Sequence, residues 1–212
     1  MQSSWPRMHD SGIEFPPQSG HPEGVGLLVE AYACVVSGRT AWYVSSPLTS
    51  GKRSREWRRR NAERVGAAAA LTSENFTRDV LAPNRKDAAR FVETLRARQN
   101  QVVIDPVALA DIPDWKQSDY QVLWARVIER YVATVVFREG WQVSNGCAWE
   151  LLTAYLADCR LLREDLSPLE MPTAQALLET TVSAPDGSPA FLVAVLDALK
   201  HNRRNREWRA PN

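Results

Sequence analysis

The sequence predicts an α/β fold, and the alternation of two kinds of segment is the main reason. Short apolar segments rich in β-branched and aromatic residues alternate with longer segments of helical periodicity. The strand-like segments are residues 41–46, 102–106, 133–137 and 159–162. Strands that alternate with helices in this way form a parallel sheet with right-handed crossovers. Ligands of such sheets bind beyond the carboxyl ends of the strands.

The predicted helices show apolar spacing together with residues that begin or end a helix. The first, residues 24–37, has apolar residues at helical spacing and stops before Gly38. Pro83 or Asn84 opens another helix, because proline is favoured in the first helical turn. Further helical patterns cover residues 54–70, 118–131, 173–181 and 189–201. We therefore expect a Rossmann-like (flavodoxin-like) parallel sheet flanked by helices, with appended N- and C-terminal helices.

The length of the chain indicates how many domains it forms, and its net charge indicates which classes of partner it can bind. The 212 residues, 44% of them hydrophobic, suit one globular domain with additions at both ends. We divide the chain into a flexible or loosely docked arm (1–23), an α/β domain (24–165) and a helical extension with a basic tail (166–212). A net charge of +1 gives no general attraction to nucleic acid or to an anionic membrane. Neither is expected as a partner.

Other sequence features limit the location and the chemistry. No apolar run approaches the roughly 18 residues of a membrane span, and the N-terminus lacks the features of a signal peptide, which favours a cytoplasmic protein. The cysteines, Cys34, Cys147 and Cys159, lack paired metal-binding spacing, and the three histidines lie near the chain ends. The sequence contains no G-x-G-x-x-G motif, so a Rossmann dehydrogenase is disfavoured. We expect no metal site, no histidine-based triad and no cofactor.

The most informative segment follows the third predicted strand. Ser144 is a plausible helix N-cap, and Gly146 allows close approach of the backbone to a ligand. Glu150 falls in the early part of the helix, where its carboxylate can face a pocket and stabilise positive charge on a sugar carbon. Trp141 could stack on a base or could close the core.

A second polar segment follows the first predicted strand. It comprises Ser45, Ser46, Pro47, Thr49, Ser50 and Gly51. Hydroxyl and backbone groups here could bind sugar hydroxyls or a 5′-phosphate, and the basic residues Lys52, Arg53 and Arg55 could supply counter-charge, which favours nucleotides over nucleosides. The alternative is a polar loop followed by a solvated basic face of a helix.

These two segments resemble the nucleoside 2-deoxyribosyltransferase-like superfamily, which includes nucleotide N-hydrolases and many uncharacterised phage and bacterial relatives. Residues 43–51 look like the first strand and substrate-binding loop of the family, and Ser144, Gly146 and Glu150 look like its S-x-G-x-x-x-E signature. The similarity spans residues 41–162. It implies that Glu150 attacks the anomeric carbon of a nucleoside or nucleotide without a metal, that the sugar then passes to water or to another base, and that the chain forms a homo-oligomer.

Arg126 departs from the pattern of this family. Counted without gaps, it stands eight residues before Thr134, where relatives carry an aspartate that contacts the sugar. An arginine there would suit an anionic ligand, and it could also pair with Glu150 and leave a site that binds a nucleotide without cutting it. The acid could instead come from elsewhere in the chain. The candidates are Asp119, Glu129 and Glu139.

The sequence therefore supports two main hypotheses of different classes. The first is an enzyme that hydrolyses or transfers at the N-glycosidic bond of a nucleotide or nucleoside, with Glu150 as nucleophile. The second is a nucleotide-binding module or sensor without turnover. A third hypothesis is an NAD glycohydrolase, and it depends only on the fold that the resembled superfamily shares with such enzymes.

Overall fold

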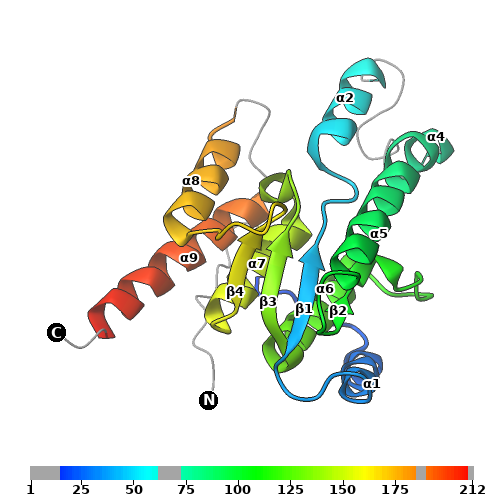
Figure 1. The fold of residues 1–212 in the computed structure, drawn as a ribbon. Helices are drawn as coiled ribbons and strands as arrows, with labels where there is room; N and C mark the ends of the chain where they lie inside the picture. The colour runs from blue at the N-terminus through cyan, green and yellow to red at the C-terminus, as the bar shows by residue number, and fades with distance from the viewer. Residues whose placement is uncertain (1–14, 62–72, 185–189, 210–212) are drawn as a thin grey trace.

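A four-stranded, all-parallel sheet forms the centre of the protein in the computed structural model, which describes residues 15–61, 73–184 and 190–209 (Figure 1). The strands are β1 (Ala41–Ser45), β2 (Val103–Ile104), β3 (Val132–Phe137) and β4 (Arg160–Arg163). Their order across the sheet is β2-β1-β3-β4, so the chain moves from β1 to one edge and then returns to the other side of β1. This order confirms the predicted Rossmann-like α/β fold. It also places the reversal of strand order between β1 and β3, where open α/β sheets bind ligands.

Helices connect and cover these strands. They are α1 (Pro22–Ala33), α2 (Gly51–Asn61), α4 (Glu74–Phe76), α5 (Ala82–Arg96), α6 (Gln117–Tyr131), α7 (Asn145–Leu156), α8 (Met171–Val182) and α9 (Ala190–Arg209). A π-helical turn, Thr77–Leu81, joins α4 to α5, and 3-10 turns at Pro106–Ala108 and Trp141–Val143 follow β2 and β3. No helix in the described ranges is long and apolar enough to cross a membrane.

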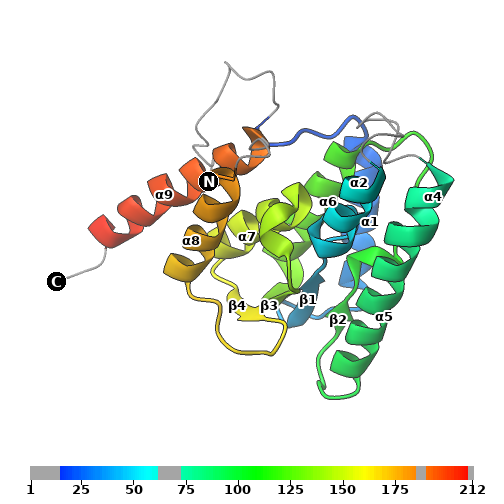
Figure 2. The ribbon, with the colours of Figure 1, turned by 90° about the horizontal axis from the view of Figure 1, so that it is seen from above.

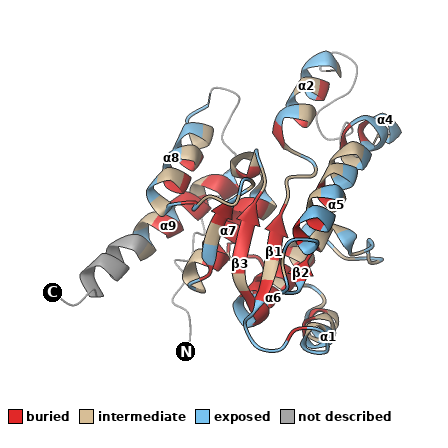
Figure 3. Cartoon of the chain, in the orientation of Figure 1, coloured by how far each residue is buried: buried red, intermediate tan, exposed pale blue. Residues whose placement is uncertain are grey.

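The two faces of the sheet pack against different helices. Side chains alternate along a strand, so Tyr43 and Val44 of β1 point to opposite faces. Tyr43 belongs to a large core cluster with residues of α1, α6, α7 and α9, whereas Val44 packs with Val92 and Leu95 of α5. Figure 2 shows α6 and α7 together on one side of the sheet, and Figure 3 shows that buried residues concentrate in the strands and in the helical faces turned toward them. The sheet is thus covered on both sides, as expected for parallel strands.

The chain segments outside the central domain take part in the same core. Phe15 is buried, and its ring meets those of Trp149 and Phe191 edge-on at 5.5 and 5.8 Å. Leu192 and Leu199 of α9 are fully buried in the large cluster. The part of the N-terminal arm from Phe15 onward and the C-terminal helices therefore pack on the α/β domain. Residues 1–14 and the side chains from residue 203 onward lie outside the described part.

A small separate cluster holds α2 beyond the carboxyl end of β1 (Figure 1). Trp57 of α2 packs edge-on against Phe76 at 5.2 Å and also meets Val80 of the π-helical turn. That turn precedes Pro83, which has no N–H for the helical hydrogen bond and whose ring crowds the preceding turn, so a local widening of the helix is expected there. The predicted basic helix starts at Gly51, three residues earlier than expected, and residues 62–70 of the predicted segment lie outside the described part.

Candidate active site

Glu150 lies where the reversal of strand order predicts a ligand site. Its carboxylate is buried between α7 and β1, and Tyr43 and Ser45 donate hydrogen bonds to its two oxygens. The Tyr43 hydroxyl lies 2.7 Å from Oε1 and the Ser45 hydroxyl 2.5 Å from Oε2. Tyr43 and Ser45 are two residues apart on β1, so they share the face that α7 covers. Two side chains of one strand, β1, therefore orient the Glu150 carboxylate.

The start of α7 fixes the position of Glu150 along the helix. Ser144 is the N-cap, as predicted, and its hydroxyl accepts a hydrogen bond from the backbone N–H of Cys147. Glu150 lies six residues after this cap, which turns it back toward β1. Substitution of the cap would loosen the first turn of α7 and with it the geometry of the carboxylate.

Burial alters the protonation of this group. It raises the pKa of Glu150 to about 7, although the hydrogen bonds from Ser45 and Tyr43 act in the opposite direction. Burial and the nearby carboxylate also raise the pKa of Tyr43 well above its ordinary value, so Tyr43 remains a hydrogen-bond donor at neutral pH. Glu150 can therefore change charge near neutral pH, which is typical of a catalytic carboxyl group.

A cavity of about 840 Å³ opens in front of Glu150. Its size lies in the upper part of the range usual for small-molecule sites, which is roughly 300–1,000 Å³. The described residues that line it come from the loop after β1, from α2, from the π-helical turn and the start of α5, from the segment after β2, from α6, from the start of α7 and from Phe191 of α9. Glu150 and Asp111 are the acidic residues among them, and the side chain of Asp111 is 85% exposed.

The loop after β1 contributes polar groups that have no internal partner. The hydroxyls of Ser46 and Ser50 are buried from solvent and form no hydrogen bond. Both residues line the cavity together with Thr49 and Gly51. Gly51 has a φ of 84°, a backbone conformation that favours glycine, and it begins α2. Unpaired buried hydroxyls beside a helix start are suited to an oxyanion, which would satisfy them.

Three arginines face the same cavity. Arg55 and Arg58 come from α2 and Arg85 from α5. Of the basic residues expected from the sequence only Arg55 lines the cavity, since Lys52 is exposed and Arg53 pairs with Asp87 at 3.1 Å. The described cavity wall is thus basic away from Glu150.

Aromatic and amide side chains form another part of the cavity wall. Tyr120 and Trp124 of α6 and Phe191 of α9 line the cavity, and the amide residues Gln117 and Gln121 lie beside them. Flat rings suit the stacking of a planar base, and amides can hydrogen-bond to its edge. The cavity therefore combines a buried carboxylate, a basic region and an aromatic wall.

Arg126 and Trp141 lie outside the cavity. Arg126 is on the exposed side of α6, so the expected contact with the ligand and the ion pair with Glu150 are absent. Trp141 is buried in the core, with its ring 5.5 Å from that of Phe137, which is the second of the two roles considered for it. Counting residues without gaps gave the wrong position for Arg126, because the packing of the apolar face sets the register of α6. Leu123, Val127 and Ile128 turn toward the core, so Arg126 turns outward.

The other candidates divide between cavity and scaffold. Asp119 does not line the cavity; it is buried at the start of α6, where it accepts hydrogen bonds from Ser19 and from the backbone of Lys116 and His21. Burial alone would raise the pKa of Asp119, but these bonds outweigh it and lower the pKa to about 2. Glu129, Glu139 and Pro47 also lie outside the cavity lining. Ser45 holds Glu150 but does not itself line the cavity. The sequence candidates that line it are Ser46, Thr49, Ser50, Gly51, Arg55, Ser144, Gly146 and Glu150.

Sequence reasoning missed several residues of the site. Tyr43 could have been found, because strand alternation puts it on the same face as Ser45. Arg58 could also have been found, since it is three residues after Arg55 and so shares its helical face. Arg85 and Phe191 reach the cavity only through long-range packing, and no local signal marks them.

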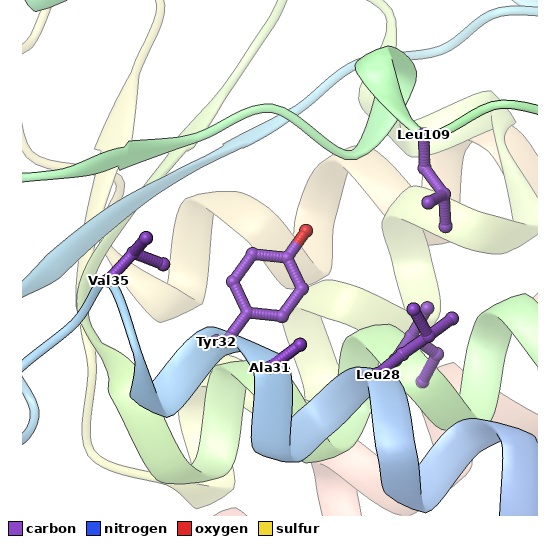
Figure 4. A pocket seen from close by; sticks show the side chains of 6 residues that line it. Leu28, Ala31, Tyr32, Val35 and Leu109 are labelled. Carbon is purple, nitrogen blue, oxygen red and sulfur yellow. The ribbon is translucent and has the colours of Figure 1, made fainter.

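A second cavity, of about 230 Å³, is apolar and lies apart from Glu150. It is lined by Leu28, Ala31, Tyr32, Val35, Leu109 and Leu123. In Figure 4 the labelled side chains of α1 lie on one side of it and Leu109 on the other. Its lining offers no carboxylate or cationic group, and no cluster of metal-binding side chains occurs among the described residues.

The cysteines give a first test of this packing. Cys34 is exposed, whereas Cys147 beside Glu150 and Cys159 are buried. Burial raises the pKa of both buried thiols, that of Cys147 to about 12. We expect a disulfide reagent to titrate one thiol rapidly in the native protein at pH 8 and three after denaturation. Rapid reaction of three native thiols would contradict this arrangement.

Comparisons of the chain with protein-family models, with curated proteins and with solved structures gave no match.

Proposed function

We propose that this protein cleaves the N-glycosidic bond of a 5′-phosphorylated nucleoside, with Glu150 as the nucleophile. The observation that carries the proposal is the buried Glu150 carboxylate, oriented by Tyr43 and Ser45 and facing a cavity of about 840 Å³. Cleavage of an N-glycosidic bond develops positive charge at the sugar carbon, and an adjacent anion stabilises or captures it.

The reaction follows from these groups. One carboxylate oxygen of Glu150 bonds to C1′ while the C1′–N bond breaks, and the base leaves with the electron pair and takes a proton from water. A second water then attacks C1′, releases the Glu150 carboxylate and gives up a proton. Tyr43 and Ser45 hold the carboxylate in one orientation for both steps. The aromatic wall of Tyr120, Trp124 and Phe191 would stack on the base.

Release of free base tests the proposal. The protein is incubated with a panel of ribo- and deoxyribonucleotides, and free bases are separated by chromatography. We expect release from at least one 5′-phosphorylated member and slower release from the matching nucleoside, which lacks the phosphate that the Ser46 and Ser50 hydroxyls would bind. No release from any member, combined with tight binding, would overturn catalysis.

That outcome would support the second candidate, a nucleotide-binding module without turnover. One observation favours it: among the described cavity residues no second buried carboxylate accompanies Glu150, whereas most glycosidases use two. A ligand-induced rise in the melting temperature without base release would identify such a module. Turnover by the unmodified protein would exclude it.

The pH dependence of kcat/KM gives an independent prediction. A Glu150 nucleophile must be ionised, and its pKa is about 7, so kcat/KM should fall about tenfold per pH unit below pH 7. The Tyr43→Phe variant removes a hydrogen bond that lowers this pKa, so we expect the acid limb to move upward by about 1 pH unit. Tyr155→Phe, on α7 but outside the cavity lining, is the matched control. A flat profile between pH 5 and 8 would be inconsistent with the role of Glu150.

A further inference from the structure

The basic part of the cavity extends along α2 and across to α5. Arg55 and Arg58 are three residues apart, so they lie on one face of α2, one turn from each other. Neither has an acidic partner among the described residues. Arg85 pairs with Asp111 at 3.5 Å, but both side chains are solvent-exposed, and such pairs exchange readily for a better partner. Three guanidinium groups are therefore open to an anionic ligand.

The two arginines of α2 lie at increasing distance from the sheet. The helix α2 begins at Gly51 and runs away from the carboxyl end of β1, as Figure 1 shows. With a helical rise of about 1.5 Å per residue, Arg55 is roughly 6 Å and Arg58 roughly 10 Å along the axis from Gly51. Gly51 itself packs against the loop after β3, since its Cα lies 3.6 Å from the place where a Cβ on Gly140 would be. The start of α2 is thus close to the site and its arginines are farther out.

A single phosphate would use only the inner end of this arrangement. The unpaired hydroxyls of Ser46 and Ser50 and the start of α2 would suit an anion on the loop that follows β1, next to the strand residues that hold Glu150. A phosphate bound there would leave the outer arginine, Arg58, without a counter-charge. A chain of two or three phosphates that begins at this inner site would extend along α2 past Arg55 to Arg58, and Arg85 of α5 lines the same cavity. The volume of about 840 Å³ is large enough for this longer ligand.

We propose that the Glu150 site binds substrates whose 5′ carbon carries a diphosphate or triphosphate, with the inner phosphate at Ser46 and Ser50 and the outer phosphates at Arg55, Arg58 and Arg85. That these ligands are substrates rests on the proposed function, whereas their binding can be tested without catalysis. Nucleoside diphosphates, nucleoside triphosphates and dinucleotides joined by a pyrophosphate share this chemistry. Guanidinium groups suit it because each can bind phosphate oxygens through two N–H groups.

Binding to the Glu150→Gln variant tests the inference without turnover. Dissociation constants are measured by calorimetry for a nucleoside and its mono-, di- and triphosphate, which share one base and one sugar, and for the dinucleotide that contains the same nucleoside. We expect the affinity to rise at least tenfold from the monophosphate to the triphosphate. A dinucleotide as tight as the diphosphate would indicate that the outer end accepts a second nucleoside, whereas a weaker one would limit the class to free di- and triphosphates.

Two variants in the same background locate the effect. Arg58→Ala should reduce the ratio between triphosphate and monophosphate affinity to about threefold or less, whereas Arg59→Ala, exposed on the same helix and outside the cavity lining, should preserve it. Equal affinity for mono- and triphosphate, or an equal loss for both in Arg58→Ala, would overturn the inference. A phosphate-dependent gradient without base release by the unmodified protein would overturn the proposed function alone. Base release from a monophosphate without any gradient would overturn this inference alone.

Discussion

Replacement of Glu150 by glutamine is expected to lower the rate of base release by at least about 10³-fold, because an amide neither attacks C1′ nor stabilises its positive charge. The substitution preserves the shape of the side chain. Tyr43 can still donate to the amide oxygen, and the amide N–H can donate to the Ser45 hydroxyl, which then rotates. The loss should therefore be chemical rather than structural. Single-turnover base release, followed by chromatography, measures it.

A matched substitution and a fold measurement make this result specific. Glu139→Gln changes the same chemical group at an exposed position outside the cavity lining and should leave the rate unchanged. Circular dichroism should show native secondary structure in both variants. If Glu150→Gln releases base at the unmodified rate, another group performs the chemistry and Glu150 has a structural role.

The sheet and the position of Glu150 were predictable because their signals are local. Short β-branched segments identified the strands, and the alternation with helices indicated the parallel arrangement that the structure confirms. A strand followed by Ser144 and Gly146 indicated a helix start at the carboxyl edge of the sheet, and the structure has α7 begin there. The ten residues 141–150 were therefore enough to locate Glu150 in the helix that begins at the carboxyl end of β3.

The parts of the cavity that depend on distant segments were not predictable in this way. The register of α6 is fixed by packing of its inner face, so a count along the chain put Arg126 in the site although Gln121 and Trp124 line it. Phe191 reaches the cavity because α9 packs on α7, and the pairing of α9 with the domain has no local signature. Burial of Glu150 is also a tertiary property, so its raised pKa could not be derived from the sequence.

The raised pKa of Glu150 has a consequence for stability that does not depend on any substrate. The pKa is about 7 in the folded protein and 4.5 in an ordinary glutamate, so the folded state binds the proton more tightly than the unfolded state. The stabilisation from this proton is complete below pH 4.5 and is lost as the pH rises through 7. At 1.36 kcal/mol per pKa unit, the free energy of unfolding should fall by about 3 kcal/mol across this range from this group alone.

Glu150→Gln removes that titration and should therefore gain stability relative to the unmodified protein as the pH rises. Urea denaturation of both proteins at pH 5 and pH 8 gives the difference in the free energy of unfolding at each pH, and effects of the other titrating groups cancel between the two proteins. We expect the difference to favour the glutamine variant by about 2 to 3 kcal/mol more at pH 8 than at pH 5. The same substitution would then abolish base release and stabilise the fold above pH 7, which is the combination that separates a buried functional carboxylate from one retained for stability. A difference that does not change with pH would show that Glu150 is solvated in the native protein, and it would remove the physical basis for its pKa near 7.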